Sequence, residues 1–229
     1  MADLPAPPGS SEGRGLFISL EGPDGSGKTS QAARLAATFE RHGLEVVLAR
    51  EPGGTELGER LRELLLHRDE LAFEPLADAL LFNAARAQLV GEVIRPALAA
   101  GHTVVCARFA DSTLAYQGYG AGVDLDTLRS LEAIATAGLR PDLIILLDLP
   151  VEAGLARKRR GRTALTRFES RLDVAFHRRV RYGFLQLARA EPERWRVIDA
   201  ARPRTAVTAD VAAAAKSLLD ARRAEVEPV

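Results

Sequence analysis

The chain has little sulfur and few aromatic residues: its 229 residues include one Cys, one Met and one Trp, and Phe, Trp and Tyr together make up 5%. The single cysteine, Cys106, excludes an internal disulfide and is typical of a reducing compartment. No run approaches the ~18 consecutive apolar residues of a membrane-spanning helix, and the first residues lack the basic and apolar regions of a signal peptide. We therefore expect a cytoplasmic protein with no membrane partner.

A net charge is also absent, but the charges are unevenly distributed. The segment 157–181 contains ten Lys and Arg residues against Glu169 and Asp173, so it carries +8 and the rest of the chain carries −8. With 47% hydrophobic residues, a chain of this length can bury a substantial core in one domain. Residues 1–15 are rich in Pro, Gly, Ala and Ser, so we expect a disordered extension there and a single domain at 16–229.

The segment Gly22–Thr29 reads Gly-Pro-Asp-Gly-Ser-Gly-Lys-Thr, a complete G-x-x-x-x-G-K-[ST] phosphate loop. An apolar run at 16–20 precedes it and a helical pattern follows it, which is the strand–turn–helix context that the motif requires. The glycines let successive N–H groups point at phosphate oxygens, the helix N-terminus and Lys28 add positive charge, and the Thr29 hydroxyl suits magnesium. The loop therefore predicts binding of a nucleoside triphosphate.

Four further apolar runs predict strands at 45–49, 103–107, 143–147 and 196–198. Most are continuous rather than alternating, as in strands that are covered on both faces. Helical patterns separate them, at about 28–42, 56–66, 75–99, 125–137, 168–190 and 204–222. This alternation predicts an α/β fold with a five-stranded parallel sheet flanked by helices in three layers. The stretch 157–166 is the candidate for a short Arg-rich lid.

An arginine stands at the end of each of the second and third predicted strands. Arg50 and Arg108 are therefore expected at the carboxyl edge of the sheet, beside the phosphate loop. Two guanidinium groups there suit the phosphate of a second substrate. Either arginine alone could equally be a surface cation in a turn, but the pair beside a phosphate loop favours the binding site.

Phe82 and Arg86 are four residues apart, so they share one face of the helix predicted at 75–99. A ring and a guanidinium on one face suit a planar base. A core phenylalanine beside an arginine that reaches the surface fits the same spacing, and spacing alone favours this second interpretation. The hydroxyl, amide and glycine residues at 112–120 likewise fit either nucleoside recognition or a turn-rich loop.

The basic segment at 157–163 admits three interpretations. Dense arginine can neutralise a nucleic-acid backbone, form a lid that stabilises charge on a transferring phosphoryl group, or make up a solvated basic helix. Arg157, Arg159 and Arg160 stand beside Gly161 in a chain that carries a phosphate loop. This context favours the lid over nucleic-acid binding.

Together these motifs resemble the thymidylate kinase family of bacterial type, among the phosphate-loop nucleoside monophosphate kinases. The resemblance runs from about Leu16 to Leu219 and is carried by the stretches 20–29, 50–55, 81–86, 111–118 and 140–148. Arg-Glu-Pro-Gly-Gly-Thr and Ser-Thr-Leu-Ala-Tyr-Gln-Gly are close to diagnostic, whereas the phosphate loop alone is not. A loop without a basic residue before Gly27, together with arginines in the lid, is typical of the bacterial branch.

The resemblance implies a P-loop NTPase fold, ATP as phosphoryl donor, Mg²⁺, dTMP as acceptor, and a homodimer formed through part of 75–99. Phe82 would stack on thymine, Arg86 would bond its carbonyl edge, and Tyr116 would leave no room for a 2′-hydroxyl. The implied site residues are catalytic Lys28, Arg108, Arg157, Arg159 and Arg160; ATP-binding Gly22, Asp24, Gly25, Ser26, Gly27, Lys28, Thr29 and Ser30; dTMP-binding Asp24, Arg50, Glu51, Phe82, Arg86, Arg108, Ser112, Tyr116 and Gln117; and metal-binding Thr29 and Asp24.

Two positions depart from the family pattern. The family usually has Asp-Arg at the end of the third strand, where this chain has Ala107-Arg108. The change removes a carboxylate from a site in which magnesium normally uses one or two. Thr166-Arg167 also stands where Asp-Arg is more usual. We hypothesise that the fold and dTMP binding persist while metal affinity or turnover is reduced.

The expected reaction is ATP + dTMP giving ADP + dTDP, which requires in-line positioning and charge neutralisation but no covalent intermediate. A deoxynucleoside kinase on the same scaffold is one alternative, although it would not need two arginines for an acceptor phosphate. A degenerate homologue that binds nucleotide without turnover is another, and Ala107 keeps it open. A nucleic-acid-binding ATPase would show steep salt dependence. We expect no nucleic-acid partner.

Overall fold

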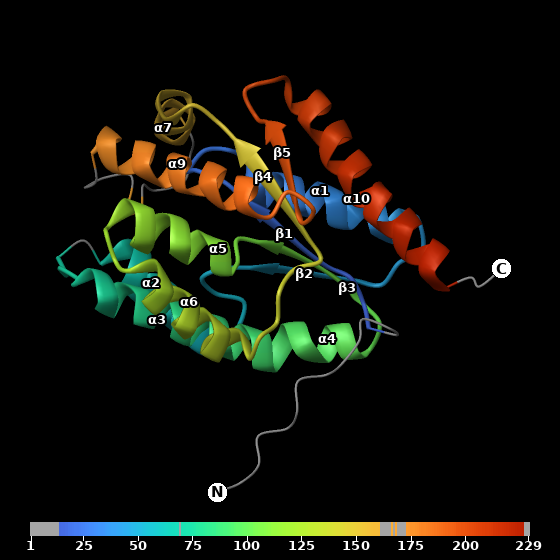
Figure 1. The fold of residues 1–229 in the computed structure, drawn as a ribbon, viewed down its shortest axis with the longest axis horizontal. Coiled ribbons are helices and arrows are strands. Elements are labelled where there is room, and N and C mark those ends of the chain that lie inside the picture. The colour runs from blue at the N-terminus through green and yellow to red at the C-terminus, as the bar shows by residue number, and fades with distance from the viewer. Residues whose placement is uncertain (1–13, 69, 161–165, 167, 169–172, 227–229) are drawn as a thin grey trace, which may run out of the picture.

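The computed structural model describes residues 14–68, 70–160, 166, 168 and 173–226. One parallel sheet of five strands runs through it in the order β2-β3-β1-β4-β5 (Figure 1). The strands are β1 (Phe17–Glu21), β2 (Val46–Arg50), β3 (Thr103–Ala107), β4 (Leu143–Asp148) and β5 (Trp195–Asp199). The α/β prediction is confirmed. Each predicted strand begins and ends within one residue of the bounds of the observed strand.

Helices connect the strands and lie on both faces of the sheet (Figure 1). They are α1 (Lys28–Arg41), α2 (Glu56–His67), α3 (Pro75–Leu89), α4 (Arg95–Ala99), α5 (Ala110–Thr113), α6 (Leu125–Thr136), α7 (Val151–Arg160), α9 (Val174–Ala190) and α10 (Arg204–Val226). Two π-helical segments, η1 (Val90–Ile94) and η2 (Leu114–Gly120), continue α3 into α4 and extend α5. The long helix predicted at 75–99 is thus present, with a π-helical turn inside it.

Three local predictions need correction. The stretch 112–120 is mostly the π-helical segment η2 rather than a turn-rich loop. The basic residues 157–160 form the last turn of helix α7; no helix was predicted at 151–160 from the apolar pattern, although a basic helix was one interpretation of the stretch 157–163. The helix predicted from residue 168 has its described part in α9, which begins at Val174 with Asp173 accepting the Phe176 N–H at 2.7 Å. The remainder of the predicted lid, 161–165, lies outside the described residues.

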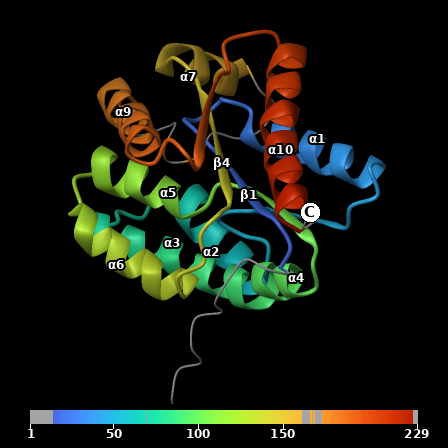
Figure 2. The ribbon, with the colours of Figure 1, turned by 45° about the vertical axis from the view of Figure 1, so that its right-hand side comes forward.

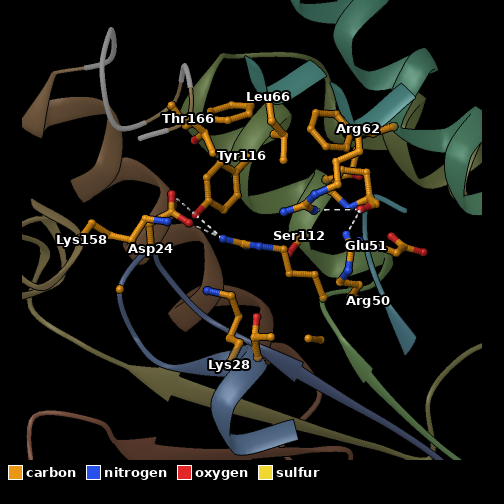
Figure 3. A pocket seen from close by; sticks show the side chains of 18 of the residues that line it. Asp24, Lys28, Arg50, Glu51, Arg62, Leu66, Ser112, Tyr116, Lys158 and Thr166 are labelled. Carbon is orange, nitrogen blue, oxygen red and sulfur yellow. Dashed lines mark hydrogen bonds and ion pairs between the residues drawn. The ribbon is translucent and has the colours of Figure 1, made fainter. Parts of the chain in front are cut away.

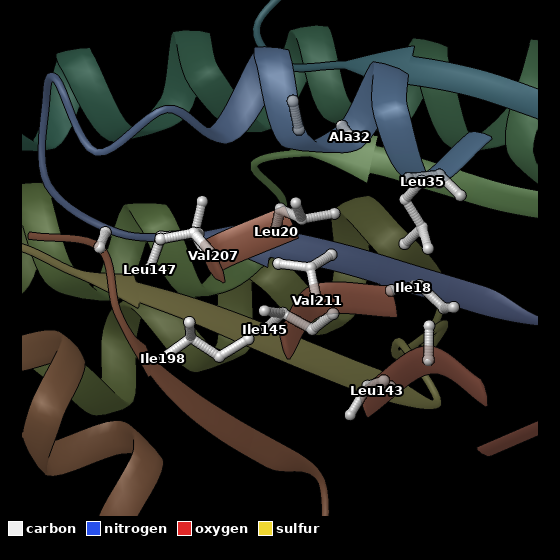
Figure 4. Close-up of a cluster of buried hydrophobic side chains, with 14 of the residues drawn as sticks. Ile18, Leu20, Ala32, Leu35, Leu143, Ile145, Leu147, Ile198, Val207 and Val211 are labelled. Atoms are coloured by element: carbon white, nitrogen blue, oxygen red, sulfur yellow. The ribbon is translucent and has the colours of Figure 1, made fainter. Parts of the chain in front are cut away.

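One face of the sheet packs against α1 and α10. Ile18, Leu20, Ile145 and Leu147 point from the two central strands into this layer (Figure 4). Their helical partners include Ala32 and Leu35 of α1 and Val207 and Val211 of α10. Figure 2 shows these two helices side by side against the sheet. The layer fixes α1, and therefore the phosphate loop at its N-terminus, against β1.

The other face packs against α3, α4, α9 and η2. Ile144 and Leu146 of β4 contact the α9 residues Val180 and Phe184. On this same face, Phe17 at the start of β1 packs edge-on against Phe109, which follows β3; their ring centroids are 4.9 Å apart. Because side chains alternate along a strand, Glu21 of β1 falls on this same face, directly before the phosphate loop.

The predicted extension at 1–15 lies outside the described residues apart from Arg14 and Gly15. Arg14 pairs with Asp142, and the Gly15 N–H donates to the Leu98 carbonyl at 2.8 Å. In the described part of the chain, we find no helix whose length and apolar character would let it span a membrane.

Candidate active site

A cavity of about 430 Å³ opens at the carboxyl ends of β1, β2 and β3 (Figure 3). This is the edge of a parallel sheet at which ligands bind in open α/β folds. The residues that line it come from six segments: Asp24, Gly25, Gly27, Lys28, Thr29 and Ser30; Arg50, Glu51 and Pro52; Arg62 and Leu66; Phe82 and Arg86; Ala107, Arg108, Ser112, Thr113, Tyr116 and Gln117; and Arg157, Lys158, Thr166 and Phe168.

The phosphate loop adopts a backbone that only glycine accommodates at its centre. Gly25 has φ 76°, and a Cβ there would lie 2.2 Å from the Gly154 carbonyl oxygen. Buried beneath the loop, the Lys28 ammonium donates to the carbonyls of Gly22 at 2.9 Å and Pro23 at 2.8 Å. Burial, followed by the charge of Arg108, lowers the pKa of Lys28 to about 7. The free loop therefore holds a lysine that titrates near neutral pH.

Arg108 joins the phosphate loop to the opposite wall of the cavity. Its Nη2 group donates to the Asp24 carboxylate and, at 3.0 Å, to the Tyr116 hydroxyl, which itself donates to Asp24 at 2.8 Å (Figure 3). The guanidinium also lies over the Tyr116 ring, 4.8 Å from its centroid. Burial raises the pKa of Asp24, but Arg108 and Lys28 outweigh burial and hold that pKa below its ordinary value.

The backbone of Arg108 is strained and is supported by Glu21. Arg108 has φ 74°, a left-handed conformation that costs a non-glycine residue about 1–2 kcal/mol. The buried Glu21 carboxylate accepts the Phe109 N–H at 2.6 Å and the Ser112 hydroxyl at 2.6 Å. Ser112 in turn accepts a bond from Arg108 at 3.1 Å. Burial, followed by the charge of Asp111, raises the pKa of Glu21 to about 7.

Arg50 and Arg62 form a second cationic group on the α2 side of the cavity. Arg50 binds the Glu59 carboxylate through Nη2, at 2.7 and 2.8 Å. Arg62 donates to the Pro52 carbonyl at 2.9 Å. Both guanidinium groups keep further N–H donors for an anionic ligand, because an arginine carries five. Arg50 was expected here from its place at a strand end, whereas Arg62 was not.

Arg86 is almost wholly buried, with 1% of its side chain exposed, and pairs with Glu51. Arg86 donates four hydrogen bonds, to the Glu51 carboxylate through Nε, the Asn83 amide oxygen, the Thr113 hydroxyl and the Phe109 carbonyl, and its Nη2 group also lies 2.7 Å from the Glu51 carboxylate. Burial raises the pKa of Glu51, and Arg86 works against that rise. Glu51 Oε1 is buried without a hydrogen-bond partner among the described residues. Arg86 thus braces the cavity wall as well as lining it.

Aromatic side chains form the remaining wall. Phe168 lies 6.1 Å from Phe82 and 5.5 Å from Tyr116, measured between ring centroids. These rings give the cavity apolar surface beside its arginines, which suits a planar base. Phe82 and Tyr116 were expected here, but Phe168 was not.

The lid candidates divide into two groups. The exposed Arg157 lines the cavity and donates twice to the Ala200 carbonyl, at 3.1 Å, and Lys158 lines the cavity beside it. Arg159 and Arg160 are exposed on the same turn of α7 but do not line the cavity. Lys158 was not among the expected site residues, although it stands within the same basic run.

All nine residues expected at the acceptor side line the cavity, namely Asp24, Arg50, Glu51, Phe82, Arg86, Arg108, Ser112, Tyr116 and Gln117. Among the expected ATP-binding residues, Gly22 and Ser26 belong to the loop but do not line the cavity. The lining residues that were not among the expected site residues are Pro52, Arg62, Leu66, Ala107, Thr113, Lys158, Thr166 and Phe168.

Comparison with known proteins gives a consistent result. The family model described as thymidylate kinase matches residues 20–211. A thymidylate kinase of Deinococcus radiodurans is 54% identical over 202 residues, covering 88% of this chain and 96% of that protein. One from Pseudomonas fluorescens is 51% identical, covering 91% and 99%. The crystal structure of thymidylate kinase from Ehrlichia chaffeensis superposes with a TM-score of 0.70 at 36% identity, covering 86% and 97%.

Proposed function

This chain belongs to the thymidylate kinase family and transfers the γ-phosphoryl group of ATP to dTMP, and we propose how its cavity divides that task. The backbone of the phosphate loop, Lys28 and Thr29 bind the triphosphate at the N-terminus of α1. Arg108 binds the acceptor phosphate and the group in transfer. The observation that supports this division is the position of Arg108, whose guanidinium contacts Asp24 of the loop and Tyr116 of the opposite wall.

The acceptor half of the cavity holds dTMP. Phe82 stacks on the base, and the ring of Tyr116 packs under the deoxyribose, which excludes a 2′-hydroxyl. Arg50 and Arg62 bind the phosphate together with Arg108, since guanidinium groups match phosphate oxygens bidentately. Arg86 reaches the carbonyl edge of thymine when one of its five donors is released from a protein acceptor.

The oxygen donors in the cavity fit Mg²⁺. The exposed Thr29 hydroxyl and the Asp24 carboxylate both line it, and the described residues contain no cluster of three metal-ligating side chains. Magnesium commonly takes one or two protein oxygens and completes its shell with phosphates and water. We therefore assign Thr29 and Asp24 to hold it, and the ion would neutralise charge on the ATP phosphates.

The basic turn of α7 neutralises the phosphoryl group in transfer. Arg157 and Lys158 already line the cavity, while Arg159 and Arg160 act only if α7 moves toward the ligand. A closing lid excludes water and so favours transfer to dTMP over hydrolysis.

The Arg108→Lys variant tests the central assignment, because it keeps the charge and removes the planar fork. We expect kcat/KM for dTMP to fall about 100-fold, since one transition-state donor is worth roughly that, with the Kd for ATP nearly unchanged. Arg129→Lys is the matched control, because Arg129 forms an exposed ion pair on α6. An unchanged kcat/KM in Arg108→Lys, measured by coupled ADP release, would refute the assignment. Activity on thymidine instead of dTMP would favour a deoxynucleoside kinase.

A further inference from the structure

A buried carboxylate behind the cavity fixes a buried amide within it. Gln117 lies on η2, is 3% exposed and lines the cavity. Asp78 lies in the first turn of α3, is 5% exposed and does not line the cavity. The Gln117 Nε2 group donates to Asp78 Oδ2 at 2.8 Å, and both side chains are buried.

This bond determines which end of the amide faces the ligand. A carboxylate accepts hydrogen bonds, and the bond from Nε2 to Asp78 Oδ2 leaves the amide oxygen Oε1 on the side away from Asp78. The reverse orientation would bring two acceptor oxygens together and leave a buried hydrogen bond unmade. In the described part of the chain, no donor is bonded to Gln117 Oε1. The Gln117 oxygen Oε1 is therefore available to accept a hydrogen bond from a ligand in the cavity.

The polarity of that position distinguishes pyrimidines. Thymine and uracil carry a hydrogen on N3, whereas cytosine has a lone pair there. An oxygen that faces N3 accepts the thymine hydrogen but repels the cytosine nitrogen. A site built to hydrogen-bond a ligand group discriminates strongly against an analogue without it, because buried polar atoms are then left unpaired.

We propose that Asp78 is a positioning residue that holds the amide oxygen of Gln117 toward the base and thereby selects a pyrimidine with a hydrogen on N3. The inference rests on the proposed function, and it takes the base that stacks on Phe82 to lie against Gln117, which lines the same cavity. Arg86 cannot substitute for this role, because a guanidinium group only donates and offers no acceptor for the N3 hydrogen.

The test compares dTMP with 5-methyl-dCMP, which has the same shape and methyl group but the opposite polarity at N3 and at the neighbouring exocyclic position. In Asp78→Asn, the side chain can donate to Gln117 Oε1, so the amide can turn over. We expect the ratio of kcat/KM for dTMP to that for 5-methyl-dCMP to fall at least about tenfold. In Asp78→Glu, which still only accepts, that ratio should stay close to the wild-type value.

Asp126→Asn is the matched control, because Asp126 is an exposed acid in the first turn of α6. It removes the same charge from an equivalent helical position without contacting Gln117. A purely structural role for Asp78 would lower kcat/KM for both substrates together and leave their ratio unchanged, which would overturn the proposal.

Gln117→Leu separates this inference from the proposed function. If Gln117→Leu lowers the ratio and Asp78→Asn does not, Asp78 has no positioning role. If Gln117→Leu changes neither the ratio nor kcat/KM for dTMP, the base does not lie against Gln117 and the proposed site is wrong.

A measurement on the unaltered protein covers the case in which the Asp78 variants do not fold. The side-chain amide of Gln117 is assigned by NMR from the signal lost in Gln117→Leu. In the dTMP complex, one Nε2 proton should exchange slowly with solvent because it is bonded to Asp78. Rapid exchange of both protons would overturn the proposal.

Discussion

The carboxylate of Glu21, at the end of β1, accepts the backbone N–H of Phe109, which follows the end of the neighbouring strand β3, at 2.6 Å. This contact lies immediately after Arg108 and immediately before the phosphate loop. It therefore fixes the strained Arg108 backbone relative to the loop that binds ATP. Glu21 does not line the cavity, so it acts through the residues that do.

Removing this support should impair catalysis more than it impairs ATP binding. In Glu21→Ala, we expect Arg108 to leave its left-handed conformation and kcat/KM for dTMP to fall about tenfold, given a strain of about 1–2 kcal/mol. Glu21→Gln should retain most activity, because an amide can still accept from Phe109 and bond to Ser112. Steady-state kinetics of both variants, with calorimetric ATP binding, provide the measurement. Equal losses in both variants would show that the carboxylate has another role.

The buried pair of Arg86 and Glu51 should be important for stability. Glu51→Gln removes the carboxylate that pairs with the buried Arg86 guanidinium, and breaking a buried ion pair costs about 3–5 kcal/mol. We expect urea unfolding to show a loss of that order. The matched control is Glu56→Gln, which breaks an exposed pair with Arg60 and should have no measurable effect. Similar stability of the two variants would contradict the assignment.

The three inner strands, β1, β3 and β4, were predictable because each is a short, mostly apolar run that is buried on both faces. The edge strands β2 and β5 are partly exposed, and their alternation with helical stretches indicated them. The segment η2 was not predictable, because Gly118 and Gly120 are typical of turns. In the structure their missing side chains make room for packing: a Cβ at Gly118 would lie 2.5 Å from Leu125, and one at Gly120 would lie 2.7 Å from Phe176. Those neighbours come from α6 and α9, so local sequence carried no sign of them.

The residues of the site likewise divide into those that a local motif identifies and those that only the folded chain brings together. Residues inside motifs, such as Lys28 and Arg108, could be assigned from sequence, because the motif itself fixes their position relative to phosphate. Arg62 could not be assigned from sequence. A single cation on an amphipathic helix has the same pattern as a solvated residue, and only the position of α2 in the fold brings Arg62 to the cavity. Glu21 and Asp78 were missed because their partners are distant in sequence, 91 residues for the Glu21–Ser112 bond and 39 for the Asp78–Gln117 bond.

The lowered pKa of Lys28 predicts that ATP binding takes up a proton. In the free protein, burial lowers this pKa to about 7, and bound triphosphate should raise it again by opposite charge. Above pH 7 the affinity for ATP should therefore fall as pH rises. Calorimetry at pH 8 in buffers of different ionisation enthalpy should show net proton uptake. Lys28→Arg should show none, because arginine stays protonated. No uptake by the unaltered protein would disprove the prediction.

A homodimer formed through α3, as proposed from the family resemblance, predicts that α3 residues control association. Leu76 and Leu80 of α3 are 46% and 48% exposed, and Leu57 of α2 is 46% exposed. Such a group of exposed leucines favours a protein interface. We expect light scattering to show a dimer that Leu80→Glu converts to a monomer, while Val197→Glu, at an exposed position on β5, leaves it intact. A Leu80→Glu protein that stays dimeric would exclude this interface.

Ala107 stands where the family usually has aspartate, and restoring the carboxylate should strengthen the metal site. Ala107 is 4% exposed and lines the cavity between Arg50 and Arg108, so a carboxylate there would have cationic neighbours to offset its burial. We expect Ala107→Asp to raise kcat and to lower the Mg²⁺ concentration that gives half-maximal activity. Ala107→Asn, equal in size but uncharged, should reproduce neither effect. If Ala107→Asp changes neither quantity, the alanine imposes no catalytic cost, and Thr29 with Asp24 suffices to hold the ion.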